Sequence, residues 1–480
     1  MSPDSALDID RRPPLSTPAF PVQPYQQPEK VRSTKEADVM PVDILVLGAT
    51  GYTGRLITRY LYNHPQRSSF TFALGVRSIS KGESLKNSLG LDDSVQLVQV
   101  DVTRYDEIEA AVKDAKVVIN SIGPYWLWGT EVVRACALHG KRYVDLCGET
   151  HFIRKIIDQY DYLATKTGAI IVPASGFDSI PADITVFLSN RTLKNALGTH
   201  VQLGLSQSFY SAHVKPSGGT LASVLSTVEV APPNKVLEAV KDYALSPIKG
   251  APSPGFRPLV RVPFSSPPQY GTVWFMEPYN RAVVQRTFGL NQVALSAASA
   301  LFGDKQGKEK EEQVRPLAYG PEFSYAEYYV EEGPGGVFSA IFFTAFMAVY
   351  MAALYIGPIR WVIKKFLPAP GEGPSEEELK KGFLKVTNYT ATASSPQTWA
   401  KTTMTGKADP GYLLTATMIS ECALGLLLDD ADLPPTARAG GILTPATALG
   451  DVIVRRIEAT GEMHFESEII SANEESRKER

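Results

Sequence analysis

Short apolar runs alternate with helix-like stretches in the first part of the chain. The runs of strand length are residues 44–47, 70–76, 95–102 and 117–129. After the first run, apolar residues recur at helical spacing (Leu56, Ile57, Tyr60, Leu61), and residues 107–115 show a second helical pattern. Continuous apolar runs of this length are typical of buried parallel strands. The alternation therefore predicts an α/β fold with a Rossmann-type, doubly wound parallel sheet over residues 41–185.

A glycine-rich loop, GATGYTG at residues 48–54, joins the first apolar run to the first helical pattern. Gly48 permits the tight turn, Gly51 lets the backbone approach a pyrophosphate, and Gly54 lets the helix pack on the strand. We therefore predict that this loop binds a dinucleotide. Its predicted cofactor-binding residues are Gly48, Ala49, Thr50, Gly51, Tyr52, Thr53 and Gly54.

Cations and hydroxyl groups follow the second apolar run. Arg77 and Lys81, together with two serines, stand where an NAD-specific domain usually places an acid for the ribose 2′-hydroxyl. A cation at this position suits a 2′-phosphate, so NADP(H) is favoured over NAD(H). The alternative is a solvated strand end that binds nothing.

Polar and small residues follow the next strands of the predicted sheet. Ligands bind beyond the carboxyl ends of parallel strands. We therefore predict that Asp101 faces the adenine and that Ser121, Gly123 and Pro124 lie beside the nicotinamide.

Several blocks in the chain resemble one known family. They are GATGYTGR, SIGPY, YVDLCGE and GFDSIPAD between residues 48 and 183, then PGEGPSEEE, KADPGY and GGILTPATALG between residues 370 and 450. In combination they resemble the saccharopine dehydrogenase-like oxidoreductases, which include the trans-acting enoyl reductases of bacterial lipid synthesis. The resemblance covers residues 42–464. It implies a Rossmann domain, a second α+β domain built from the middle and the end of the chain, and NAD(P)-linked redox chemistry.

The resemblance does not imply saccharopine as the substrate. The true saccharopine enzymes tend to have a GxGxxx first loop, whereas Ala49 and Thr50 stand between the first glycines here, and this chain has a long apolar insert. A saccharopine dehydrogenase of lysine metabolism is therefore the minor alternative.

Hydride transfer needs a group near the nicotinamide that stabilises or protonates the resulting anion. Tyr125, Asp178 and Ser179 lie in blocks that converge on strand ends and are the candidate catalytic residues. Asp145 and Glu149 are interpreted as structural, because an acid after a strand often caps the next helix. No metal site is predicted, since no histidine or cysteine shows ligand spacing.

An uncharged apolar segment at residues 336–359 interrupts this enzyme-like sequence. A helix of that length, at about 1.5 Å per residue, could cross the roughly 30 Å hydrocarbon core of a bilayer. Arg360, Lys364 and Lys365 follow among aromatic and aliphatic residues, which is typical of a membrane interface. Because both flanks are predicted to be cytoplasmic, we expect a hairpin or monotopic anchor. A single span and a fully buried core helix are the alternatives.

The chain is thus predicted to have six parts. They are a disordered, Pro-rich leader (1–40), the Rossmann domain (41–185), the first part of the α+β substrate domain (186–335), the membrane- or droplet-associating insert (336–367), a C-terminal part that folds back onto both domains (368–464) and a polar tail (465–480).

The composition argues against some classes of partner and of covalent cross-link. A net charge of -3 gives no basic field for nucleic acid, and three cysteines are too few for a disulfide framework. The expected location is the cytoplasmic face of the endoplasmic reticulum or a lipid droplet, as for the droplet-associated eukaryotic members that the chain resembles. Asp4, Asp8 and Asp10 disfavour a mitochondrial address. A homo-oligomer is compatible with the sequence, which does not determine the number of subunits.

The leading hypothesis is therefore an NADP(H)-dependent oxidoreductase, docked on a membrane or lipid droplet, that reduces an activated double bond or a carbonyl of a lipid-like substrate. The rival hypothesis is a lipid-droplet scaffold protein that binds nucleotide without turnover. A defined proton donor beside the nicotinamide would favour the enzyme.

Overall fold

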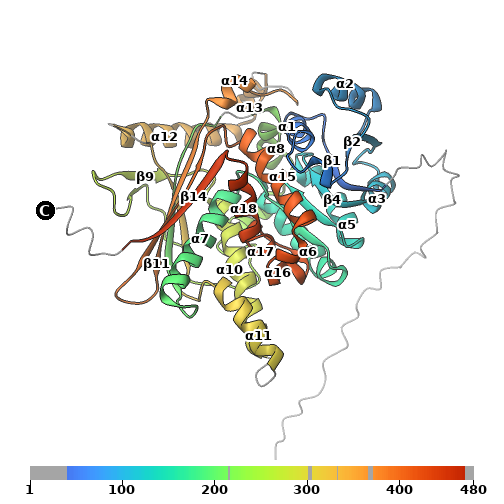
Figure 1. Cartoon of the computed structure of the whole chain (residues 1–480). Helices are drawn as coiled ribbons and strands as arrows, with labels where there is room; N and C mark the ends of the chain where they lie inside the picture. The colour runs from blue at the N-terminus through green and yellow to red at the C-terminus, as the bar shows by residue number, and fades with distance from the viewer. Residues whose placement is uncertain are drawn as a thin grey trace, which may run out of the picture. The chain divides into compact units, whose positions relative to one another are not determined.

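A parallel seven-stranded sheet surrounds the strand that precedes the glycine-rich loop. In this computed structural model its order is β13-β6-β5-β4-β1-β2-β3, and every neighbouring pair is parallel. Figure 1 labels β1 and its two neighbours, β2 and β4. The strands are β1 (Val42–Leu47), β2 (Phe72–Val76), β3 (Gln96–Gln99), β4 (Ala115–Asn120), β5 (Arg142–Asp145), β6 (Ile170–Val172) and β13 (Gly441–Ile442). The predicted α/β fold with a Rossmann-type sheet is confirmed.

The structure describes residues 41–214, 217–300, 305–331, 333, 335–365 and 371–470. The predicted leader, residues 366–367 of the insert and the last ten residues of the predicted tail lie outside the described residues.

Helices cover the parallel sheet on both faces. From the N-terminal part come α1 (Tyr52–Tyr62), η1 (Arg67–Ser69), α2 (Ile79–Leu89), α3 (Tyr105–Lys113), α4 (Tyr125–Trp128), α5 (Thr130–Leu138) and α6 (Thr150–Thr167). The C-terminal part supplies α15 (Leu413–Leu428), which is apolar nearly all round and packs on α1, β4 and β5. A parallel sheet needs both faces covered, and α15 meets that need from a distant part of the chain.

The second sheet is mixed and has the order β14-β12-β11-β7-β10-β9-β8. Its strands are β7 (Leu203–Ala212), β8 (Leu259–Arg261), β9 (Tyr270–Val273), β10 (Ser324–Tyr329), β11 (Leu384–Thr392), β12 (Trp399–Gly406) and β14 (Met463–Ile470). Only β7 and β10 pair in parallel. The strands come from the middle and the end of the chain, so this sheet is the second domain that the family resemblance implied.

Two long helices pack on the second sheet. They are α7 (Ile180–Leu197), which contacts β11, β12 and β14, and α10 (Glu277–Ala300), which contacts β10. The remaining elements are α8 (Gly218–Glu229), α9 (Pro233–Ala239), α11 (Lys305–Val314), η2 (Arg315–Leu317), α12 (Gly336–Leu354), α13 (Gly357–Lys364), α14 (Glu376–Lys380), η3 (Asp430–Asp432), α16 (Pro435–Arg438), α17 (Pro445–Ala448) and α18 (Asp451–Ala459).

Two predicted boundaries differ from the structure. The boundary at residue 185 falls inside α7, which runs without a break to Leu197. The predicted polar tail begins inside β14, where Met463 and Phe465 are buried while His464 and Glu466 are exposed. This period-two alternation is that of a half-buried strand, so residues 465–470 are part of the sheet.

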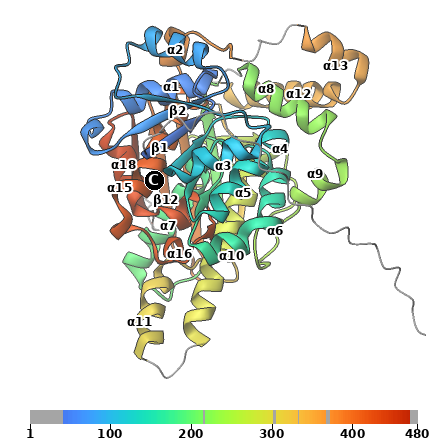
Figure 2. The ribbon, with the colours of Figure 1, turned by 90° about the vertical axis from the view of Figure 1, so that its right-hand side faces the viewer.

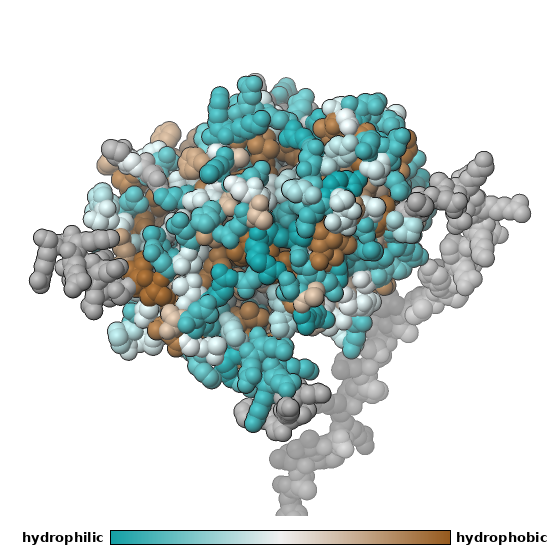
Figure 3. Space-filling model, viewed as in Figure 1, coloured by the Kyte–Doolittle hydropathy of each residue, from teal (hydrophilic) through white to brown (hydrophobic). Residues whose placement is uncertain are grey.

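The apolar helix α12 lies at the edge of the second sheet rather than in a core. Thr344 donates hydrogen bonds to Thr272 Oγ1 (3.1 Å) and to the Val273 carbonyl (3.3 Å), which attaches the helix to β9. Only 11% of its most apolar stretch is buried, with Phe338 and Phe342 about three-quarters exposed. Figure 3 shows this apolar surface over α12, at the upper left. The alternative of a fully buried core helix is therefore wrong.

Candidate functional site

The three glycines of the loop have three different physical roles. Gly48 has φ +82°, and a side-chain carbon there would come within 2.8 Å of both Ser121 and Ile122. At Gly54 the same carbon would lie 2.1 Å from the Gly48 carbonyl oxygen, so only glycine lets α1 approach the loop. Gly51 precedes the first turn of α1 and has open space beside it, apart from one carbonyl oxygen at 3.1 Å. The first N–H groups of a helix have no intrahelical acceptor, so this end of α1 suits a pyrophosphate.

A segment from the distant PGEGPSEEE block lies against α1 just beyond this loop. The Tyr52 hydroxyl donates to the Pro374 carbonyl (2.5 Å), Arg55 donates to the Gly371 carbonyl (2.6 Å), and Arg59 pairs with Glu376. The predicted cofactor residue Tyr52 thus also links α1 to the segment around residue 374.

The residues predicted to bind the 2′-phosphate lie at the end of β2 and the start of α2. The Ser78 hydroxyl caps the helix through the Lys81 N–H (3.5 Å) and hydrogen-bonds Ser80 (2.9 Å). Arg77 and Lys81 are exposed, and neither forms an ion pair with a described residue. Hydrogen bonds from Thr103, with a smaller effect of the nearby Arg77 charge, lower the pKa of Asp101. The end of β2 therefore presents a cation and hydroxyl groups next to Asp101.

At the other end of the loop, the structure places the predicted nicotinamide residues beside Gly48. Ser121 donates to the Leu47 carbonyl (2.8 Å), which ties β4 to β1 under the glycine turn. Gly123 faces Ser223 of α8, since a side-chain carbon at Gly123 would lie 3.2 Å from the Ser223 hydroxyl oxygen. Helix α8 therefore covers this end of the predicted cofactor site.

The structure corrects the role predicted for Tyr125. Its hydroxyl is buried, donates to the Asn120 carbonyl (3.0 Å) and accepts from the Leu146 N–H (3.1 Å). Burial also raises its pKa well above the usual value. Because its one proton is held by a backbone carbonyl, Tyr125 ties β4 to the loop after β5 and is a poor proton donor to a substrate.

Asp145 and Glu149 hold backbone in place, as their structural interpretation expected. Asp145 accepts from the N–H groups of Cys147 and Ala174 (both 2.9 Å) and from the Tyr143 hydroxyl (2.7 Å). Glu149 lies at the start of α6 but caps another helix, accepting from the first two N–H groups of α4 (both 2.8 Å). Burial raises the pKa of Glu149 and raises that of Asp145 to about 6.

Asp178 and Ser179 lie at the same carboxyl edge of the sheet, but their side chains do not hold backbone groups in place. The carboxyl group of Asp178 accepts no hydrogen bond from a described residue, and its Oδ2 lies 2.7 Å from the point where a Gly148 side-chain carbon would be. Ser179 precedes the first turn of α7, but its side chain does not cap the helix. Of the three predicted catalytic residues, these two have side chains that form no hydrogen bond with a described residue.

Sequence reasoning missed one hydroxyl at this edge. This hydroxyl belongs to Tyr279, in the first turn of α10. Burial is the main cause that raises the pKa of Tyr279 to about 12, and the negative charges of Asp178 and Glu149 add to the effect. No motif or spacing marked this tyrosine, because α10 follows the strand β9 of the second sheet and reaches the site only through the tertiary fold.

We expect Asp178→Asn to stabilise the protein at neutral pH. Burial, with the Asp145 charge adding to it, raises the pKa of Asp178 from 3.8 to about 6. The folded state therefore binds this proton more tightly than the unfolded state does. The free energy of unfolding falls as the pH rises from about 4 to about 6, and the whole loss is present at about pH 7.5. Urea unfolding should show a gain of about 1 to 3 kcal/mol at about pH 7.5 and little gain at about pH 4.

Asp145→Asn is the matched control. Its carboxyl group has a similarly raised pKa but accepts three hydrogen bonds, so this variant should be destabilised at both pH values. Equal loss of stability in both variants would show that Asp178 has a structural partner.

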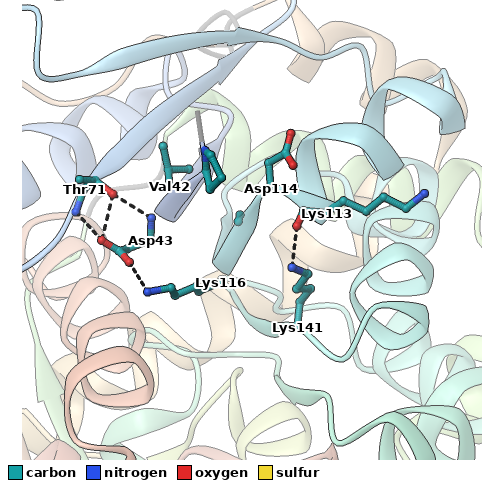
Figure 4. A pocket seen from close by; sticks show the side chains of 9 residues that line it. Val42, Asp43, Thr71, Lys113, Asp114, Lys116 and Lys141 are labelled. Atoms are coloured by element: carbon teal, nitrogen blue, oxygen red, sulfur yellow. Dashed lines mark hydrogen bonds and ion pairs between the residues drawn. The ribbon is translucent and has the colours of Figure 1, made fainter. Parts of the chain in front are cut away.

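A second hollow lies at the opposite edge of the parallel sheet, and most of its polar groups have partners. It is lined by residues at the amino ends of β1 and β4 (Figure 4). Lys116 pairs with Asp43 (2.8 Å), which also accepts from Thr71, and Lys141 donates to the Lys113 carbonyl (2.7 Å). Asp43, Lys116 and Lys141 therefore already have partners within the hollow. Because ligands of parallel sheets bind beyond the carboxyl ends of the strands, the candidate site is the carboxyl edge.

Comparison with known proteins agrees with this placement. Residues 44–172 match the family model of the saccharopine dehydrogenase NADP binding domain. A Mycobacterium tuberculosis protein provisionally named a trans-acting enoyl reductase is 32% identical over 435 residues, which are 87% of this chain and 96% of the relative. The chain belongs to the saccharopine dehydrogenase-like oxidoreductase family.

Other relatives are similar at comparable coverage. Trans-acting enoyl reductases of Mycobacterium tuberculosis and Mycobacterium ulcerans are 30% and 29% identical, each over 87% of this chain and 96% of the relative. Apo saccharopine dehydrogenase from Saccharomyces cerevisiae, a solved structure, matches with a TM-score of 0.45 and 12% identity over 90% of this chain and 100% of that one. At this TM-score the structural likeness adds nothing to the assignment.

The prediction of NADP(H) as the cofactor is confirmed by the matched domain. The residues present fit it: Gly48, Gly51 and the first turn of α1 suit the pyrophosphate, and Arg77 suits the 2′-phosphate. When bound, NADPH supplies a hydride. The contacts of each cofactor-binding residue with NADP(H) remain predictions.

Proposed function

We propose that this NADP(H)-dependent oxidoreductase docks on a membrane or lipid-droplet surface and reduces an enoyl or carbonyl group of a lipid-like substrate. The substrate class comes from the names of the enoyl reductase relatives. The observation that carries the docking is α12, an uncharged helix of 19 residues that is attached to the second sheet on one side and exposed on the rest.

Helix α13 supports an interfacial position for this segment. Trp361 is exposed, and the Lys365 ammonium lies 3.5 Å from the centre of its ring. Trp and Lys beside an apolar helix are typical of a membrane interface. Arg360 and Lys364 both pair with Glu229, the last residue of α8, at 2.8 and 2.6 Å. Figure 2 shows α8 close to α12 and α13, so the proposed docking helices are joined to the helix that covers the nicotinamide end.

The strand order argues for a monotopic anchor rather than a single span. β10 precedes α12 and β11 follows α13, yet both pair with β7 in one sheet. A single crossing of α12 would place these two strands on opposite sides of the bilayer. Chain that enters and leaves on one side is compatible with a bilayer and with the single phospholipid layer of a droplet.

The sequon at Asn388, in Asn388-Tyr389-Thr390, would not report this topology. The Asn388 side chain is fully buried in β11 and hydrogen-bonded to Ser189, Ser206, Ser208 and Thr390 at 2.7 to 3.0 Å. A folded β11 gives a glycosyltransferase no access to it on either side of a membrane.

The electrostatics of the site favour an uncharged substrate over saccharopine. Asp178 and Glu149 share the carboxyl edge, and no cation of a described residue lowers the pKa of either carboxyl group. Saccharopine carries several carboxylates, which such a site would repel. The lysine-metabolism alternative is therefore disfavoured.

The test is turnover by the purified full chain with NADPH and the N-acetylcysteamine thioester of trans-2-decenoic acid. We expect consumption of NADPH and formation of the saturated thioester, with no reduction of NADP⁺ by saccharopine. Oxidation of saccharopine would favour the lysine-metabolism alternative. No NADPH consumption with enoyl or carbonyl compounds would favour the scaffold hypothesis.

A further inference from the structure

Behind the cofactor edge, three buried polar atoms form no well-aligned hydrogen bond with a described residue. They are the Tyr210 hydroxyl on β7, the indole N–H of Trp274 after β9 and the Oδ1 atom of Asn280 on α10. All three residues are at least 97% buried. Buried polar groups in proteins are nearly always hydrogen-bonded, so three together in one place need an explanation.

Glu327 on β10 joins these groups into one cluster. Its carboxyl group accepts from the Tyr325 hydroxyl (2.6 Å) and from Asn280 Nδ2 (2.8 Å). The Tyr210 hydroxyl lies near enough to this carboxyl group for a weak, poorly aligned hydrogen bond. The ring of Tyr210 stacks on Trp274 with centroids 5.4 Å apart. Burial raises the pKa of Glu327 to about 8, so this carboxyl group is protonated at neutral pH.

The cluster is next to the candidate site on one side. Phe177, which precedes Asp178, lies against Tyr210 with ring centroids 6.4 Å apart, and Asn280 follows Tyr279 in the first turns of α10. On the other side the aromatic contacts lead to α12: Trp274 stacks on Tyr329 (5.6 Å), which contacts Phe343 of α12 (5.0 Å). Figure 1 shows β9 beside α12.

We propose that Glu327, Asn280, Tyr210 and Trp274 form a recognition subsite for the uncharged carbonyl-bearing group of the lipid-like substrate, whose apolar chain extends toward α12. The indole N–H and the phenol donate to a carbonyl oxygen, and Asn280 Oδ1 accepts from an amide or hydroxyl group. A carboxylate is rejected, because the cluster contains no cation and a buried unpaired charge is costly. This inference rests on the proposed function and specifies its substrate class.

The test compares the affinity of the full chain for trans-2-decenamide and for trans-2-decenoate by calorimetry in the presence of NADP⁺. The wild type should bind the amide more tightly than the carboxylate. Tyr210→Phe removes the phenol hydroxyl and keeps the ring, whereas Trp274→Phe removes the indole N–H and leaves a smaller ring. Each should weaken amide binding by about fivefold to tenfold, the worth of one hydrogen bond. The melting temperature should be unchanged or higher for Tyr210→Phe and lower for Trp274→Phe, which leaves a cavity in the core. The NADPH affinity of both variants should be unchanged.

Tyr319→Phe is the matched control, because its hydroxyl is also buried and unpartnered but lies in a different core cluster. Amide affinity equal to wild type in all three variants, with enoyl turnover intact, would overturn the subsite and leave the proposed function standing. The groups would then be packing defects or hydrogen-bonded to buried water. A wild type that binds neither compound would overturn both the subsite and the lipid-like substrate class.

Discussion

Gly51→Val should abolish NADPH binding while the protein stays folded. Gly51 has φ -72° and ψ 169°, a conformation that valine adopts readily, and a side-chain carbon there would have one close neighbour, the Gly48 carbonyl oxygen at 3.1 Å. A branched side chain there would stand where the pyrophosphate approaches the first N–H groups of α1. Losing one or two charge-assisted hydrogen bonds costs about 1.5 to 3 kcal/mol each, so NADPH affinity should fall by about a hundredfold or more.

Two further glycines make this experiment decisive. Gly255 is exposed with open space around it, so Gly255→Val should leave both NADPH affinity and melting temperature unchanged. Gly54→Ala places a carbon against the Gly48 carbonyl and should lower the melting temperature. Fluorescence titration with NADPH and a thermal melt of each variant distinguish the cases. A folded Gly51→Val protein with normal NADPH affinity would show that this loop does not hold the pyrophosphate.

The sequence predicts the cofactor half of the site well because its parts are local. A strand, a glycine turn and a helix are consecutive in residues 42–62, and each has its own pattern of apolar and small residues. The carboxyl ends of parallel strands meet at one edge, so residues that follow successive strands converge without further information. Ser121 and Gly123 were placed at that edge by this rule, and Asp178 through the GFDSIPAD block of the family resemblance.

The directions of side chains and the long-range pairings were not predictable in this way. Tyr125 is at the expected strand end, yet its hydroxyl points to backbone that only the folded sheet brings near. Glu327 and Tyr279 enter from the second domain, whose strands come from distant parts of the chain. The alternation in β14 was hidden by its charged residues, which made a half-buried strand resemble a polar tail.

The exposed helix α12 gives the second prediction of large effect. Ala345, Ala348 and Ala352 are exposed, so replacing all three by Asp should leave the fold intact. Each charge placed in hydrocarbon costs about 2.5 to 3.5 kcal/mol on insertion scales, and about 1.4 kcal/mol is already a tenfold change in partitioning. In a flotation assay with phospholipid vesicles or lipid droplets, the wild type should float and the triple variant should stay in the soluble fraction.

The matched control places the same three charges elsewhere: Ser296, Ala297 and Ala300 are exposed near the end of α10. Their replacement by Asp should leave flotation unchanged, which separates loss of apolar contact from added negative charge. NADPH affinity should be equal in all three proteins, because α12 is attached to β9 and not to the glycine loop. A wild type that stays soluble in the presence of lipid would contradict docking. The exposed rings of α12 would then need a protein partner to cover them.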